Sequence, residues 1–166
     1  SCGRTGLDPR LSIIPVGGVD NMPAFVALLG RRLKVSALVD GARTSARLAR
    51  IKAAARDNGV PDSAIVACSD VPGLPTNADV EDLFDIRDYL RLYNWTFDEH
   101  LDPNDLAATG EPILKRIIDR RGGKDFDHAL PSHELTKRRG EFFANVNPST
   151  LDNFETLFRL LNATLE

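Results

Sequence analysis

The sequence predicts an α/β fold, in which a parallel sheet flanked by helices is followed by a C-terminal helical extension. Over the first hundred residues, short apolar runs alternate with helical patterns, an order typical of a parallel sheet. After Asp102-Pro103, only helical patterns appear. Apolar runs also lead into acidic residues, which would meet at the carboxyl edge of one sheet, where α/β proteins bind ligands. We therefore expect a disordered or fragment N-terminus over 1–10, an α/β core over 11–100 and a helical extension over 101–166.

Composition places the chain among ordinary globular proteins. Its 166 residues suit one domain, and the net charge of −3 provides no global attraction to nucleic acid. Cys2 and Cys68 form no spaced metal motif, which favours free thiols in a reducing cytoplasm. No apolar run has the length of a membrane span, so we expect no membrane association. The chain begins with Ser1 and not with Met, which is typical of a piece of a longer protein.

The first predicted strand covers Leu11–Val16, a continuous apolar run of the kind that is buried on both faces of a sheet. Gly17-Gly18 permits a tight turn after it. We expect a helix over Asn21–Leu29, with Asp20 as a plausible N-cap and Gly30 as its stop.

The second predicted strand covers Lys34–Val39. A helix over Arg43–Asp57 follows, because this stretch is rich in Ala, Arg, Leu and Lys, and Asn58-Gly59 closes it. Ala64–Cys68 is the third predicted strand. These elements complete the strand–helix alternation of the core.

The remaining elements are predicted to be helical. Ser69–Ala78 contains Pro72, Gly73 and Pro75 and must be a loop. Apolar residues then recur at helical spacing in four stretches, which are Val80–Tyr93, Pro112–Asp119, Ser132–Arg139 and Pro148–Leu165. No internal repeat is present.

The acidic residues near the predicted strand ends could hold a divalent metal. Mg²⁺ prefers oxygen ligands, and carboxylates at one sheet edge can share a small volume. The candidate ligands are Asp20, Asp40, Asp79, Glu81 and Asp82. Each has a plainer interpretation: Asp20 and Asp40 as helix caps, and the others as the acidic first turn of a helix.

Basic residues on the helix after Asp40 could contact nucleic acid. Arg43, Arg47 and Arg50 recur at i, i+4 and i+7 and share one helix face. Guanidinium groups bind phosphates without regard to sequence, so this stripe could follow a DNA backbone. A solvated helix face is the plainer alternative.

Other catalytic motifs are missing from the sequence. The chain has neither GxGxxG nor a Walker Gly-Lys-Ser/Thr motif, so ATP hydrolysis by this segment is not expected. His128 and His133 lie five residues apart with no second ligand pair, which favours structural or surface histidines. Cys68 is interpreted as a core thiol of the third strand.

The order of several short motifs resembles the Toprim-like domain of OLD-family (overcoming lysogenization defect) nucleases. They are Ile13-Ile-Pro-Val-Gly-Gly-Val-Asp20, Ala37-Leu-Val-Asp-Gly41, Ala78-Asp-Val-Glu-Asp-Leu-Phe84, Phe126-Asp-His and the tail over residues 150–162. The resemblance covers residues 11–165. It implies a Toprim-like parallel sheet and Mg²⁺- or Mn²⁺-dependent cleavage of DNA, with Asp40 and Glu81 as catalytic residues. It also implies an N-terminal ATPase in the parent chain and is compatible with a homo-oligomer.

Two positions depart from the family pattern. A typical Toprim strand ends in a Glu before Gly, and here that position is Gly17. The second acid of the Asp-x-Asp motif falls at Ala42. These departures keep two functions open: a nuclease with an altered acidic site, or a non-catalytic module that binds DNA or a partner, or regulates an attached ATPase.

Overall fold

The computed structural model describes residues 3–40, 46–107 and 110–165. Contacts group the chain into two compact units. The first comprises Ser1–Ala78 with Phe154–Glu166, and the second comprises Asp79–Asn153. The expected division into an N-terminus over 1–10, a core over 11–100 and an extension over 101–166 stays a prediction.

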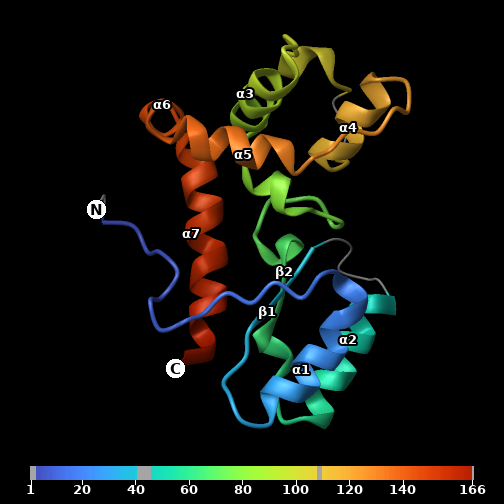
Figure 1. The fold of residues 1–166 in the computed structure, drawn as a ribbon, viewed down its shortest axis with the longest axis vertical. Helices are drawn as coiled ribbons and strands as arrows, with labels where there is room; N and C mark the ends of the chain where they lie inside the picture. The colour runs from blue at the N-terminus through green and yellow to red at the C-terminus, as the bar shows by residue number, and fades with distance from the viewer. Residues whose placement is uncertain (1–2, 41–45, 108–109, 166) are drawn as a thin grey trace. The chain divides into compact units, whose positions relative to one another are not determined.

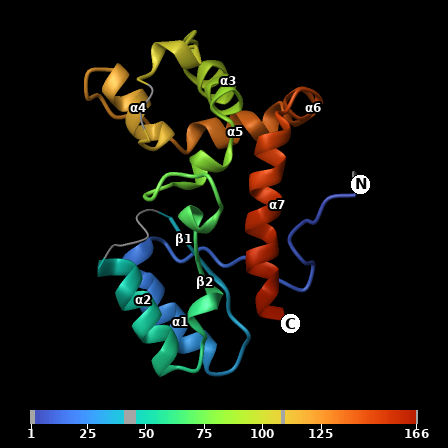
Figure 2. The same ribbon diagram turned by 180° about the vertical axis from the view of Figure 1, so that it is seen from behind.

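The first unit contains a parallel pair of strands, which confirms the α/β class. Strand β1 (Ala37–Val39) pairs with β2 (Ile65–Ala67), with Val39 opposite Ala67. Helix α1 (Met22–Gly30) and helix α2 (Ala46–Asp57) lie side by side in both views of the unit (Figures 1 and 2). Of the predicted alternation, the order helix–strand–helix–strand is present, around a sheet of two described strands.

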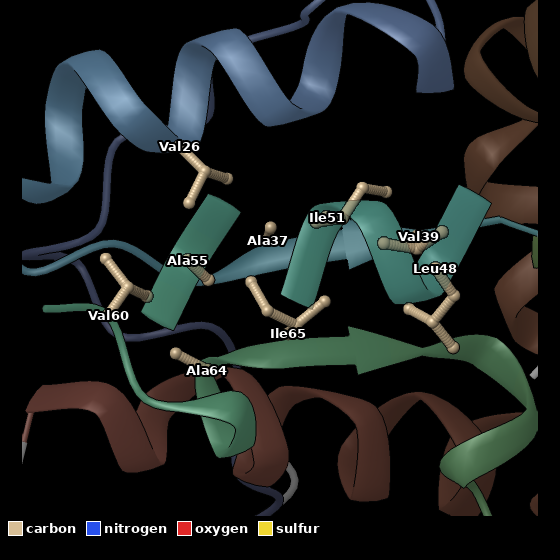
Figure 3. Packing of buried hydrophobic residues seen from close by; sticks show 9 residues of the cluster. All are labelled: Val26, Ala37, Val39, Leu48, Ile51, Ala55, Val60, Ala64 and Ile65. Carbon is tan, nitrogen blue, oxygen red and sulfur yellow. The ribbon is translucent and has the colours of Figure 1, made fainter. Parts of the chain in front are cut away.

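Apolar side chains from both helices and both strands form the core of this unit (Figure 3). Helix α2 contributes Leu48, Ile51 and Ala55, which recur on one helix face and are at most 4% exposed. Val26 of α1 points toward the same cluster. Burying each large aliphatic side chain contributes about 1.5–3 kcal/mol to stability, so this face fixes the helices on the strands.

The predicted end of α2 is also confirmed. Gly59 has φ of 78°, and the Val60 amide donates to the Ala55 carbonyl oxygen at 2.9 Å. This bond across a left-handed glycine is a Schellman cap, which satisfies a carbonyl that the helix leaves without a partner.

The predicted strand over Leu11–Val16 does not form. These residues have no regular secondary structure, and Ile13 and Ile14 are 81% and 52% exposed. Pro15 explains the failure, because proline has no amide hydrogen to donate to a central ladder. Asp20 is not a helix cap either. It lies within the 3₁₀ turn η1 (Val19–Asn21) that precedes α1.

The described part of the N-terminal segment is hydrogen-bonded to the second half of helix α7 (Pro148–Asn162). Arg4 Nη1 and the Thr5 amide donate to the two carboxylate oxygens of Glu155, at 3.0 and 3.1 Å. The Asp8 amide donates to Asn162 Oδ1 at 2.9 Å. The 3₁₀ turn η6 (Ala163–Leu165) follows α7.

This attachment is expected to weaken in acid. The Thr5 amide, with Arg159 and Arg4, lowers the pKa of Glu155 below the ordinary value of 4.5. A carboxylate whose folded pKa is lowered stabilises the fold above its unfolded pKa, and that contribution is lost as the pH falls through the folded pKa. The Thr5 amide resonance in NMR should therefore titrate with a midpoint below 4.5 and lose this transition in Glu155→Gln. A midpoint at or above 4.5 would contradict the assigned contact.

The second unit is helical, as predicted for most of it. It contains the 3₁₀ turns η4 (Val80–Leu83) and η5 (Pro103–Asp105) and the helices α3 (Ile86–Phe97), α4 (Ile113–Arg120), α5 (Leu130–Lys137) and α6 (Arg139–Ala144). Its core comprises Tyr89, Leu90, Tyr93, Leu106, Ile113 and Ile117. The single helix expected over Val80–Tyr93 is divided, because Asp85 caps α3 by accepting a hydrogen bond from the Arg87 amide.

Candidate functional site

Asp40 lies at the carboxyl end of the parallel strand pair, as predicted. It follows β1 directly and is exposed, while Cys68 follows β2 and is fully buried. Because Val39 and Ala67 are paired, both residues come to the same edge. The Cys68 thiol lies 4.0 Å from Asp40 Oδ1. The carboxylate oxygen suits a hard cation such as Mg²⁺, whereas the thiol does not.

Asp20 and Arg47 contact each other. Arg47 Nε lies 3.5 Å from Asp20 Oδ1, and the two side chains are 63% and 67% exposed. One residue was expected to bind metal and the other to bind DNA. An exposed pair of this kind contributes about 0–1 kcal/mol to stability, so either side chain can leave it at little cost. The pairing does lower the net charge that each presents to a ligand.

The arginine stripe on α2 is only partly described. Arg43, like Gly41 and Ala42, lies outside the described residues. Arg50 is exposed on α2, next to the buried Ile51. The side of α2 that carries Arg47 and Arg50 is therefore exposed to solvent, while the adjacent side, with Leu48, Ile51 and Ala55, packs in the core.

Asp82 is buried and accepts hydrogen bonds from two backbone amides. It is 5% exposed and lies in η4 of the second unit. Its Oδ2 accepts a hydrogen bond from the Asp79 amide and its Oδ1 accepts one from the Ile113 amide, both at 2.8 Å. Both carboxylate oxygens thus satisfy backbone donors and join η4 to the start of α4.

Glu81 is paired with His128, a contact that the sequence did not indicate. His128 Nδ1 lies 2.9 Å from Glu81 Oε1; the glutamate side chain is 9% exposed and the histidine side chain 57%. A carboxylate only accepts hydrogen bonds, so Nδ1 must carry the proton. The pair fixes the ring orientation and places the lone pair of neutral His128 on Nε2. Such a carboxylate–histidine pair can orient a base or a metal ligand.

Two buried oxygens, one of which belongs to this pair, have no hydrogen-bond partner among the described residues. They are Glu81 Oε2 and the Tyr89 hydroxyl. Burial, together with the charges of Glu81 and Asp82 and with Tyr93, raises the pKa of Tyr89, so it remains protonated. An unsatisfied buried oxygen is costly, which makes Glu81 the most unusual acid of the predicted set.

The five predicted metal ligands are divided between the units. Asp20 and Asp40 belong to the first unit, and Asp79, Glu81 and Asp82 share one turn of the second. Over residues 3–40, 46–107 and 110–165, no group of three or more His, Cys, Asp or Glu side chains is arranged to hold a metal ion. Asp40 therefore offers one oxygen ligand without two described companions.

Comparisons with known proteins give no family assignment. No protein-family model, curated protein or solved structure matches this chain. Within the part of the chain that the structure describes, every helix is too short or too polar to span a membrane.

Proposed function

We propose that this chain is a Toprim-like nuclease domain of an OLD-type ATP-dependent endonuclease, with an altered acidic site. The observation that supports it best is the position of Asp40. Its carboxylate is exposed directly after β1, at the carboxyl edge of a parallel pair, where α/β proteins bind ligands. The motif order around Asp40 and Glu81 supports the same proposal, with DNA as substrate and Mg²⁺ or Mn²⁺ as cofactor.

The partners follow from the same proposal. Arg50 and Arg47 on the exposed face of α2 would contact DNA phosphates, and Arg43 would extend this contact. An N-terminal ATPase in the parent chain would supply ATP dependence. A bound divalent ion would supply positive charge to the scissile phosphate. Among the described residues, Asp40 does not belong to a group of three or more His, Cys, Asp or Glu side chains that could hold this ion.

A second function is favoured by the same scarcity of ligands. A non-catalytic module that binds DNA or a partner, or regulates an attached ATPase, needs the basic helix face but no metal. The engagement of both Asp82 oxygens by backbone amides supports this alternative. The two functions differ in whether Asp40 is required for any metal-dependent chemistry.

Nicking of supercoiled plasmid tests the proposal. The protein should nick DNA with Mn²⁺ or Mg²⁺ and not with EDTA. Asp40→Ala should lower the rate by at least about a hundredfold, since losing outer-shell partners of a metal already costs 10–100-fold. Asp57→Ala is the matched control, because Asp57 is an exposed aspartate at the end of α2. Cleavage that survives Asp40→Ala would reject the site, and absence of cleavage in the wild type would favour the non-catalytic module.

A further inference from the structure

A pocket of about 660 Å³ opens in the second unit, and none of the predicted site residues lines it. It is bounded by one side of α3, the loop that follows α3, and Arg138 between α5 and α6. Its volume lies within the range of pockets that bind small molecules. All of its lining residues belong to the unit Asp79–Asn153.

The charged groups of this pocket are not equally engaged. Glu99 accepts a hydrogen bond from Arg121 at 2.9 Å, and Asp102 accepts one from the Asn104 amide at 3.0 Å. Arg87 and Asp98, by contrast, are exposed and have no side-chain partner among the described residues. The pocket therefore presents an available cation and an available anion.

These two available charges lie far apart along the pocket. Arg87 is in the first turn of α3, and Asp98 follows its last residue. Eleven residues at 1.5 Å per residue separate their backbones by about 16 Å along the helix axis. A ligand that satisfies both must be negative at one end and a hydrogen-bond donor at the other.

A planar platform lies between them. Trp95 is half-buried, and two guanidinium groups lie over its ring. The distance from Cζ to the ring centroid is 5.6 Å for Arg91 and 5.0 Å for Arg138. Arg91 is held in place by hydrogen bonds from Nη2 to Asp88 and from Nη1 to the Asn145 carbonyl. Nucleobases stack on aromatic side chains and on arginine guanidinium planes. The centre of the pocket thus suits a flat aromatic ring.

We propose that this pocket binds a nucleotide. Its phosphate pairs with Arg87, its base stacks against the Arg138–Trp95 platform, and an exocyclic amine of the base donates to Asp98. A free nucleotide and an unpaired nucleotide in a DNA strand share this chemistry. The proposal is independent of the nuclease function, because it uses neither Asp40 nor a metal.

The only tryptophan of the chain reports on this pocket, which makes binding directly measurable. Titration with dAMP in EDTA should quench Trp95 fluorescence in a saturable manner, and a short single-stranded oligodeoxyadenylate should do the same if the ligand is part of a strand. Inorganic phosphate, which lacks a base, should bind at least about tenfold more weakly. Absence of saturable quenching by both dAMP and the oligonucleotide would overturn the proposal.

Variants separate the pocket from general charge effects. Arg87→Ala should weaken dAMP binding about tenfold, the usual loss for a charged hydrogen bond. Arg120→Ala is the matched control, because Arg120 is exposed on α4 of the same unit. It should leave binding unchanged. Equal binding by Arg87→Ala and wild type, or an equal loss in Arg120→Ala, would contradict the assignment. Circular dichroism confirms that each variant is folded.

Discussion

Asp88→Ala is expected to lower the free energy of unfolding by about 3–5 kcal/mol, the usual cost of removing one partner from a buried ion pair. Asp88 is 4% exposed. Its Oδ1 accepts a hydrogen bond from Arg91 at 3.1 Å, and its Oδ2 accepts hydrogen bonds from the Asn147 amide at 2.8 Å and the Thr150 hydroxyl at 2.6 Å. The substitution leaves the Asn147 amide and the Thr150 hydroxyl without this acceptor. Arg91 loses its counter-ion and keeps only its hydrogen bonds to the Phe142 and Asn145 carbonyl oxygens.

Urea denaturation followed by circular dichroism measures this loss. Asp119→Ala is the control, because Asp119 forms an exposed pair with Lys115 on α4. That pair should contribute less than about 1 kcal/mol. If Asp88→Ala unfolds within about 1 kcal/mol of the wild type, the network does not stabilise the joint between α3 and the start of α7.

Asp82→Asn is expected to cost about 2–3 kcal/mol of stability, with no metal involved. Asparagine has one acceptor oxygen, so it cannot accept hydrogen bonds from both the Asp79 and Ile113 amides. One of these amides, of which that of Ile113 is buried and that of Asp79 partly buried, is left unsatisfied, and the remaining hydrogen bond loses its charge. Denaturation in EDTA and hydrogen exchange at the Ile113 amide measure the effect.

Asp105→Asn is a matched control for this substitution. Asp105 accepts a hydrogen bond from the Asp102 amide in η5, as Asp82 does from Asp79 in η4, but it is exposed. It should cost less than about 1 kcal/mol, because water can replace the lost bond. Equal losses for the two variants would show that the bond to Ile113 adds nothing.

Some elements that depend on the residues within one stretch of the chain were predicted correctly. The richness of the stretch in Ala, Arg, Leu and Lys predicted helix α2, and Asn58-Gly59 predicted its end. The strand predicted over Leu11–Val16 was wrong, because the prediction gave more weight to the apolar residues than to Pro15. The prediction of one helix over Val80–Tyr93 was wrong, because it did not recognise Asp85 as the cap that begins α3.

The candidate site was predictable only where topology determines it. Asp40 was placed at the strand end by the general rule for parallel sheets. The contact between Glu81 and His128 joins residues 47 positions apart, and no local spacing encodes it. The engagement of Asp82 by the Ile113 amide is equally non-local. Such contacts depend on how the helices pack, which periodicity does not specify.

Calorimetric titration with Mn²⁺ tests most directly whether Asp40, at the carboxyl end of the strand pair, takes part in a metal site. The proposed function predicts saturable binding at millimolar metal or below in the wild type, unchanged binding in Asp57→Ala and loss of binding in Asp40→Ala. Binding of equal strength in Asp40→Ala, or no measurable binding in the wild type at millimolar metal, would contradict a metal site at Asp40.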